Sequence, residues 1–156
     1  MSNYIKDIQF NLITPNTHMA SHKQALLTMA QEAADYLNIS EKILLTRIMN
    51  KEDIASSSIG DGVAIPHLKM RRARSPFAML MTLDKPVNGN AIDGKPLDIY
   101  SLLISPAEDG PIHLRRLSRI SRLLKNKTLH KRLRETKDRD VMQALFIDPE
   151  GWLLAA

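Results

Sequence analysis

Apolar residues recur at helical spacing over the first third of the chain. Ser21 is a favourable N-cap, and the apolar positions after it lie three and four residues apart, which predicts a helix over residues 22–37. A second predicted helix begins after Ser40 and continues to about Met49. The Pro15-Asn16 pair that precedes both helices predicts a turn.

The middle of the chain changes from helical spacing to short apolar runs. Small residues over 55–62 predict a loop, and the β-branched segment 63–65 predicts a short strand that ends at Pro66. Two longer apolar runs, over residues 77–83 and 97–105, predict buried strands. The prolines, asparagines and glycines between these two runs predict turns.

Helical spacing returns from Ile112 onward. The predicted helix has an apolar stripe with arginines outside it. The stripe consists of Leu114, Leu117, Ile120, Ser121 and Leu124, and the arginines are Arg115, Arg116, Arg119 and Arg122. Two shorter helices are predicted near residues 127–136 and 138–147. Residues 148–151 are predicted to break structure, and Trp152 to cover an apolar patch or to make a dimer contact.

This order of elements predicts an α/β fold, a three-layer α/β/α sandwich with a mixed sheet of about four to five strands. The sheet is expected to be mixed because closely spaced strands leave no room for parallel crossovers. A length of 156 residues fits a single domain over 1–156. The chain has no cysteine, which excludes disulfides and thiolate chemistry. The longest apolar runs are five residues and no signal segment opens the chain, so no membrane insertion and a cytoplasmic location are expected.

The net charge of +5 is unevenly distributed. Residues 113–139 hold 11 of the 22 lysines and arginines but only two acidic residues, Glu135 and Asp138, and so carry a net charge of +9. The rest of the chain has a net charge of −4. This segment is either the solvated face of amphipathic helices or a docking face for an acidic partner. It contains no aromatic residue, which argues against nucleic-acid binding.

Several motifs that would indicate other chemistry are absent. No Walker-type phosphate loop occurs, and the glycine pattern that begins at Gly60 has Ile65 where a dinucleotide fingerprint requires glycine. His18 and His22 are four residues apart, but the predicted cap at Ser21 separates them and no carboxylate follows. No metal site is therefore expected.

His67 is the strongest candidate for chemistry. It follows a glycine-bearing loop, a short strand and Pro66, so its imidazole is expected at a strand end on a fixed backbone. Backbone N–H groups and small hydroxyls, such as that of Ser57, can bind an anion there. A neutral imidazole is also a good nucleophile. The alternative is a purely structural histidine at the end of the strand.

Three segments carry a family resemblance. Residues 56–67, Ser-Ser-Ser-Ile-Gly-Asp-Gly-Val-Ala-Ile-Pro-His, resemble the active-site signature of fructose/mannitol-type enzyme IIA domains of the bacterial phosphotransferase system, approximately S-T-G-I-G-N-G-V-A-I-P-H. Residues 91–98 resemble the family's D-G-x-P-[VL]-D segment, and residues 113–120 its H-L-x-x-L-x-x-[IL] helix start. The resemblance covers about residues 8–147 and indicates a single type-2 enzyme IIA domain.

The resemblance implies a phosphocarrier without a cofactor. A phosphohistidine of HPr or a related carrier would donate its phosphoryl group to Nε2 of His67. His113 aligns with the family's second histidine, which steadies phosphate; its alternative is a surface histidine at a helix start. Ser57 and Lys51 are expected to stabilise phosphate. The active-site loop is expected to contain Gly60, Asp61, Gly62 and Pro66.

The sequence departs from the family pattern in three places. Lys51 stands where the family has an arginine, so a planar fork is replaced by a point charge, and an ordinary solvated lysine is the alternative. Asp61 replaces an asparagine, which is expected to put a negative charge near an arriving phosphate, and Ser58 replaces a glycine. None of these changes removes the nucleophile.

The closest resemblance is to the nitrogen-regulatory enzyme IIA, whose phosphorylation state regulates other proteins, such as kinases or potassium transport. The expected partners are an HPr-type phosphocarrier and regulated protein targets. One alternative is a sugar-specific enzyme IIA that passes phosphate to a IIB domain for fructose or mannitol uptake. A second is an interaction protein whose His67 is never phosphorylated.

Overall fold

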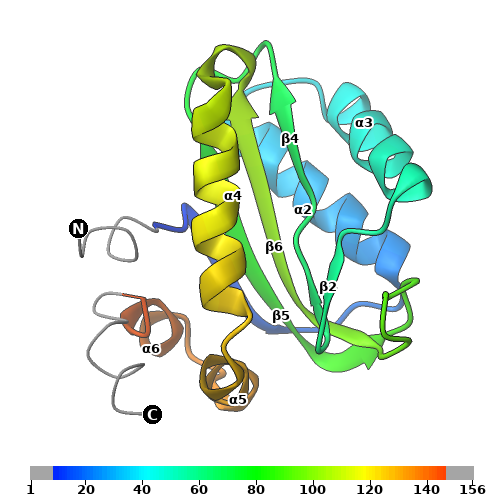
Figure 1. The fold of residues 1–156 in the computed structure, drawn as a ribbon, viewed down its shortest axis with the longest axis vertical. Coiled ribbons are helices and arrows are strands. Elements are labelled where there is room, and N and C mark those ends of the chain that lie inside the picture. Colours follow the sequence, from blue (N-terminus) through cyan, green and yellow to red (C-terminus); the bar gives the residue numbers. More distant parts are fainter. Residues whose placement is uncertain (1–8, 147–156) are drawn as a thin grey trace.

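Six strands form one mixed sheet in the computed structural model, which describes residues 9–146 (Figure 1). The strands are β1 (Leu12–Thr17), β2 (Ser58–Gly60), β3 (Val63–Ala64), β4 (His67–Met70), β5 (Phe77–Val87) and β6 (Leu97–Pro106). Their order is β1-β5-β6-β3-β2, and β4 also pairs with β6. β5 and β6 are antiparallel, whereas β1 is parallel to β5 and both β3 and β4 are parallel to β6. The predicted mixed sheet is confirmed.

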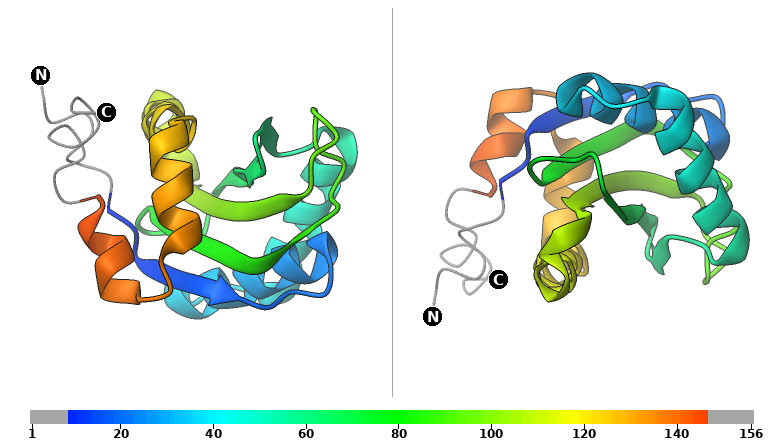
Figure 2. Two further views of the ribbon diagram at one scale, coloured as in Figure 1. Left: turned by 90° about the horizontal axis from the view of Figure 1, so that it is seen from below. Right: turned by 90° about the horizontal axis from the view of Figure 1, so that it is seen from above.

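Helices cover both faces of the sheet, which confirms the predicted three-layer α/β/α sandwich. α2 (His22–Leu37) and α3 (Glu41–Ile54) lie on one face. A 3₁₀ turn (Ala107–Asp109) leads into α4 (Pro111–Leu124), α5 (Lys127–Glu135) and α6 (Arg139–Ala144), whose buried residues pack on the other face. Figure 2 shows the sheet between α2 and α4.

The central strands are buried on both sides, which explains their continuous apolar runs. Successive side chains of a strand point to opposite faces, so Met79 and Leu102 pack with α2 and α3, whereas Leu80 and Leu103 pack with α4 and α5. All four side chains are at most 1% exposed. Two apolar cores, one on each face, therefore hold β5 and β6 rigidly.

The predicted boundaries of the first helix are correct, and the second helix is longer than predicted. Ser21 caps α2 by accepting a hydrogen bond from the backbone of Gln24. α3 continues past Met49 to Ile54, and its last turn escaped prediction because that turn is mostly polar, with Lys51 and Asp53 exposed, and so shows no apolar spacing. This extra turn places Lys51 beside the loop that follows.

The turn predicted at Pro15 and Asn16 does not connect two elements. Both residues lie within β1. Proline is tolerated there because, within residues 9–146, β1 is an edge strand that pairs only with β5. Asn16 has a φ of 51°, and its N–H donates to Thr82 Oγ1 at 2.9 Å, so the pair forms a bulge in the strand.

The short strand predicted before Pro66 does end there, as β3, but pairing along the sheet resumes after Pro66, which was not predicted. β3 pairs with β6 at Ile99 and Tyr100, and the chain pairs with β6 again from His67, which lies opposite Leu103. The carbonyl of Pro66 still accepts a hydrogen bond from the backbone of Leu103. The segment predicted as a loop also contains the short strand β2.

The buried face of α4 is rotated from the predicted stripe. Leu114 was expected in the stripe but is 63% exposed, and His113 is buried. The observed buried positions are His113, Ile120, Leu123 and Leu124. Three predictions lie wholly or partly outside the described residues. They are the last part of the helix near 138–147, the break at 148–151 and the cover by Trp152.

Candidate phosphoryl-accepting site

His67 lies at the start of β4, where the fold fixes its backbone on two sides. Pro66 precedes it, and pairing with β6 follows immediately. The half-buried ring lines a cavity of about 270 Å³ between the last turn of α3 and the loop after it. Lys51, Ser57 and Pro66 line the same cavity. Four of the residues predicted for the site are therefore together.

His113 brings a second imidazole to the site from the first turn of α4. Its Nε2 lies 3.1 Å from Nδ1 of His67, and the two ring centroids are 5.2 Å apart. His113 is only 4% exposed, so it is not a surface histidine at a helix start. Its Nδ1 lies 2.8 Å from Oγ of Ser105, a fully buried residue near the end of β6.

The hydrogen bonds of this pair are coupled through Ser105. Arg116 donates from its Nη1 to Ser105 Oγ at 3.0 Å, and the same nitrogen pairs with Asp109 at 2.5 Å. If His113 Nδ1 donates to Ser105, then His113 Nε2 accepts from His67 Nδ1, and the lone pair of His67 lies on Nε2. If Ser105 donates, both tautomers reverse and Nε2 of His67 carries the proton.

Both imidazoles are held in the neutral form. Burial, Lys51 and His113 together lower the pKa of His67 from 6.5 to about 4. Burial also lowers the pKa of His113, helped by the positive charges of Lys51, Lys69 and Arg116, although Asp109 opposes this effect. A neutral ring keeps a lone pair at neutral pH, which a nucleophile needs.

Lys51 lies in the last turn of α3 and donates from Nζ to the backbone carbonyl of His67 at 2.6 Å. Burial and then the charge of Arg47 lower its pKa. One of its three ammonium N–H groups is used in this contact, which leaves two for a ligand. Arg47, one turn earlier, donates to Sδ of Met70 at 3.1 Å.

Ser57 contributes a hydroxyl to the wall of the cavity. Its backbone N–H donates to both carboxylate oxygens of Glu52, at 3.2 and 3.3 Å. Its Oγ is buried and has no hydrogen-bond partner among residues 9–146. A buried hydroxyl without a partner is costly, so it indicates a group that a ligand would satisfy.

The glycine-bearing turn of the predicted loop lies apart from this cavity. Asp61 and Gly62 line a different, more open hollow together with Arg134 of α5. Asp61 has a φ of 55°, its carboxylate lies 3.4 Å from Nζ of Lys95, and its carbonyl accepts from Arg134 at 2.6 Å. Gly60, beside Asp61, has a φ of 96°. The Asp61 carboxylate, expected to oppose an arriving phosphate, is instead beside a lysine.

Sequence reasoning missed the residues that support the site. They are Glu52, Ser105, Arg116, Asp109 and Arg134. Ser105 carries one usable signal, since it is a hydroxyl that follows three apolar residues near the end of β6. Arg134 contacts a residue 73 positions away, whereas Glu52, Asp109 and Arg116 make contacts five to eleven residues apart that no sequence motif marks.

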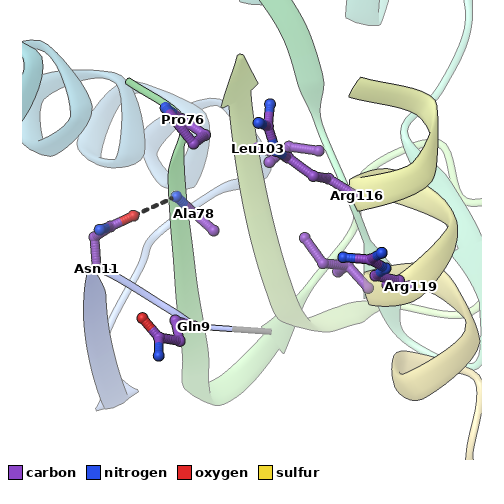
Figure 3. Close-up of a pocket in the computed structure, with 8 residues that line it drawn as sticks. Gln9, Asn11, Pro76, Ala78, Leu103, Arg116 and Arg119 are labelled. Atoms are coloured by element: carbon purple, nitrogen blue, oxygen red, sulfur yellow. Dashed lines mark hydrogen bonds between the residues drawn. The ribbon is translucent and has the colours of Figure 1, made fainter. Parts of the chain in front are cut away.

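A second cavity, of about 250 Å³, lies between the sheet and α4. Figure 3 shows Arg116 and Arg119 reaching from α4 toward Leu103 of the sheet, with Ala78 bonded to Asn11 nearby. No residue predicted for the site lines this cavity, so it is not the candidate site.

The two histidines that lie four residues apart in the sequence, His18 and His22, each have a carboxylate partner. Residues 9–146 contain no group of three side chains able to hold a metal ion, and His18 and His22 instead contact Asp84 and Glu52. None of the described helices is both long and apolar enough to cross a membrane.

Comparison with known proteins agrees with the geometry. The family model described as "Phosphoenolpyruvate-dependent sugar phosphotransferase system, EIIA 2" matches residues 8–148. A nitrogen regulatory protein of Bradyrhizobium diazoefficiens is 33% identical over 137 residues, which cover 88% of this chain and 90% of the relative. A nitrogen regulatory protein of Escherichia coli K12 is 31% identical over 135 residues, covering 86% and 83%.

Solved structures share the fold. Nitrogen regulatory protein IIA-Ntr from Neisseria meningitidis superposes with a TM-score of 0.81 at 22% identity, covering 86% of this chain and 92% of that one. IIA mannitol from Escherichia coli gives a TM-score of 0.72 at 13% identity, with coverages of 86% and 94%. On the extent of the family match and the identity to these relatives, the chain belongs to the EIIA type-2 family of the phosphoenolpyruvate-dependent sugar phosphotransferase system.

Proposed function

We propose that this protein is a phosphocarrier that accepts a phosphoryl group on Nε2 of His67 from a phosphohistidine of an HPr-type protein. The contact between His67 Nδ1 and His113 Nε2 carries the proposal, because it occupies one ring nitrogen and leaves the other for chemistry. His67 lines an accessible cavity, and its lowered pKa keeps the ring neutral at neutral pH.

The transfer requires one bond to form and one to break. The lone pair of His67 Nε2 attacks phosphorus while the phosphorus–nitrogen bond of the donor histidine breaks, and the donor ring keeps that electron pair. His67 Nδ1 keeps its proton and donates it in a hydrogen bond to His113 Nε2, while His113 Nδ1 donates to Ser105. Of the two tautomer arrangements, this is the one that leaves Nε2 of His67 nucleophilic.

The surrounding charges suit a phosphoryl group. Such transfer is promoted mainly by positioning and by cationic or hydrogen-bonding groups at the phosphoryl oxygens. Lys51 supplies an ammonium group at the edge of the cavity, and Ser57 supplies an unpartnered hydroxyl in its wall. His113 steadies the phosphorylated ring by accepting, on its Nε2, the hydrogen bond that Nδ1 of His67 donates.

A regulatory role in a single cytoplasmic domain over residues 1–156 is the branch that we favour. The support is the identity to relatives named nitrogen regulatory proteins over most of the length of both chains. In this role the phosphorylation state of His67 would alter binding to a regulated protein. The sugar-specific alternative draws on the solved complex of enzyme IIA and phosphorylated enzyme IIB for mannitol from Escherichia coli, which shares the fold.

The proposal is tested by incubating the protein with phosphoenolpyruvate, the first enzyme of the phosphotransferase system and an HPr-type carrier. Mass spectrometry of the intact protein is expected to show one acid-labile phosphoryl group, which is absent in His67→Ala and present in the control His18→Ala. A gain that persists in His67→Ala would overturn the assignment to His67.

A second assay separates the two branches. The phosphorylated protein is mixed with IIB domains for fructose and mannitol, and loss of the phosphoryl group is followed by mass. The regulatory role predicts that the group stays on His67. Rapid transfer to a IIB domain would contradict that role and favour sugar uptake.

A further inference from the structure

A strand, two helices and a loop are joined by a buried chain of hydrogen bonds beside the His67 cavity. Tyr100 Oη, in the middle of β6, lies 2.7 Å from Nδ1 of His22, the first residue of α2. Nε2 of His22 lies 3.0 Å from Oε2 of Glu52, in the last turn of α3. Glu52 in turn accepts the backbone N–H of Ser57 on both oxygens.

The bonds at the Glu52 end of this chain have a fixed direction. Burial raises the pKa of Glu52, but the bonds from His22 and Ser57 outweigh it, so the pKa is below its usual value and the carboxylate only accepts. His22 therefore donates from Nε2. The other ring nitrogen, Nδ1, is joined to Tyr100, whose pKa is raised by burial, so that the Tyr100 hydroxyl keeps its proton.

The imidazole of His22 is also held sterically. A Cβ placed on Gly89, in the connection between β5 and β6, would lie 2.6 Å from Cγ of His22. The His22 side chain is 13% exposed, that of Glu52 is 11% exposed, and Tyr100 is fully buried. Such burial makes each bond in the chain costly to lose, since an abandoned partner cannot reach water.

The chain ends at the residue that offers its hydroxyl to the cavity. Ser57 Oγ is buried, unpartnered and part of the cavity wall that His67 shares. With the backbone of Ser57 held by Glu52, the hydroxyl is set in place before a phosphoryl group arrives. Preorganised donors of this kind act without a reorganisation cost at the moment of reaction.

We propose that His22 and Tyr100 are positioning residues, which hold Glu52 so that Glu52 fixes Ser57 beside the phosphoryl group on His67. The effect on phosphorylation, the functional part of this inference, rests on the proposed function. The mechanical part, that these residues hold Ser57 in place, concerns the unphosphorylated protein. Tyr100 acts only through His22, and His22 only through Glu52. Removing both Tyr100 and His22 should therefore do no more than removing His22.

The mechanical part is tested by amide hydrogen exchange at Ser57, measured by NMR without phosphate. His22→Leu is expected to speed exchange at Ser57 by about tenfold relative to a core amide such as Leu102. Tyr100→Phe should have a smaller effect, and the double variant should equal His22→Leu. His22→Gln, whose amide can donate toward Glu52, should restore much of the protection. Gly89→Ala should imitate His22→Leu by displacing the ring.

The functional part is tested with phosphoramidate, a small phosphoryl donor that needs no docking partner. The rate of His67 phosphorylation is expected to fall by about tenfold in His22→Leu and less in Tyr100→Phe. His18→Gln and Tyr36→Phe are the matched controls, because both side chains are exposed and contact other parts of the chain. Both should leave exchange and rate unchanged.

The outcomes separate the two claims. A wild-type protein that takes up no phosphate overturns the proposed function, while the exchange results still decide whether the chain holds Ser57. Unchanged exchange at Ser57 in both His22→Leu and Gly89→Ala overturns the positioning role. Additive effects in the double variant, or equal acceleration at Leu102 and Ser57, also overturn it.

Discussion

At the scale of single residues, the site depends on two imidazoles that share one hydrogen bond. His113 occupies Nδ1 of His67 at 3.1 Å, and Ser105 holds the far side of His113. Each ring thus has one nitrogen defined by its neighbour, and the pair transmits the tautomer from the end of β6 to the cavity. In the arrangement that we propose, the nitrogen of His67 that attacks phosphorus is set by a serine that does not touch His67.

The first prediction concerns the titration of His67. Because burial, Lys51 and His113 disfavour the imidazolium form, the ring should remain neutral as pH falls below 6.5 and should gain a proton only near pH 4. Two-dimensional NMR of the imidazole nitrogens measures this titration directly. A midpoint for His67 near 6.5 would contradict the assigned environment.

Lys51→Met gives the second prediction. Removing the ammonium should raise the pKa of His67, though not to 6.5, since burial remains the largest cause of the lowering. Phosphorylation should slow by about tenfold, because a charged donor beside the cavity is lost.

Lys69→Met is the matched control for this variant. Lys69 contributes to the lowered pKa of His113 but not to that of His67. The Lys69→Met variant should therefore shift only the titration of His113. Equal shifts of His67 in both variants would show that general charge, rather than the contact of Lys51, sets the pKa.

At the scale of elements, the sequence predicts helices and strands that carry a local pattern, but not those that depend on long-range pairing. The helix over 22–37 was predictable, because a serine cap and apolar spacing both lie within it. The strand from Leu97 was predictable from its apolar run. The last turn of α3 was not, because its polar residues carry no spacing signal, and β4 was not, because pairing with β6 resumes after a proline.

The candidate site divides in the same way. His67 follows from the motif that ends in it, and the positions of Lys51 and His113 follow from the family resemblance. The contact of His113 with Ser105 brings a helix start to a strand end, and only tertiary packing determines that contact. The separation of Asp61 from the His67 cavity likewise depends on a partner in α5, which lies 73 residues away.

The third prediction concerns the connection between α5 and the glycine turn. Arg134 donates to Asp98 at 2.8 and 2.9 Å and passes so close to Gly62 that an added Cβ would lie 2.7 Å from its Nη2. Gly62→Ala should therefore lower the free energy of unfolding by more than the about 1–2 kcal/mol that a positive φ costs an alanine. Urea unfolding measures the loss.

Gly94→Ala is the control for this prediction. Gly94 also has a positive φ, of 75°, but open space surrounds the position of its Cβ. It should show the backbone cost alone. Equal losses for Gly62→Ala and Gly94→Ala would mean that the approach of Arg134 does not constrain the turn.

At the scale of the whole molecule, part of the positive charge of residues 113–139 is used in ion pairs within the fold. Two arginines of the basic segment form ion pairs with residues elsewhere, Arg116 with Asp109 and Arg134 with Asp98. The segment is therefore not only a solvated face. With one apolar core on each side of the sheet, these contacts connect the helices of one layer to strand ends and loops around the site.

The fourth prediction is the pH dependence of stability. A histidine held neutral in the fold lets the unfolded chain bind more protons between pH 6.5 and about 4, so stability is lost as pH falls through that window. His113 acts in the same direction. The free energy of unfolding should therefore drop between pH 6.5 and about 4, and less steeply in His67→Ala. An identical slope in His67→Ala would contradict this account.

The central claim is that Nε2 of His67 carries the phosphoryl group while Nδ1 donates to His113. NMR of the phosphorylated, nitrogen-15-labelled protein tests it at the level of atoms, through the coupling between phosphorus and each ring nitrogen. The account predicts phosphorus bound to Nε2 of His67 and a protonated Nδ1. Phosphorus on Nδ1, on His113, or on no nitrogen of the protein would contradict it.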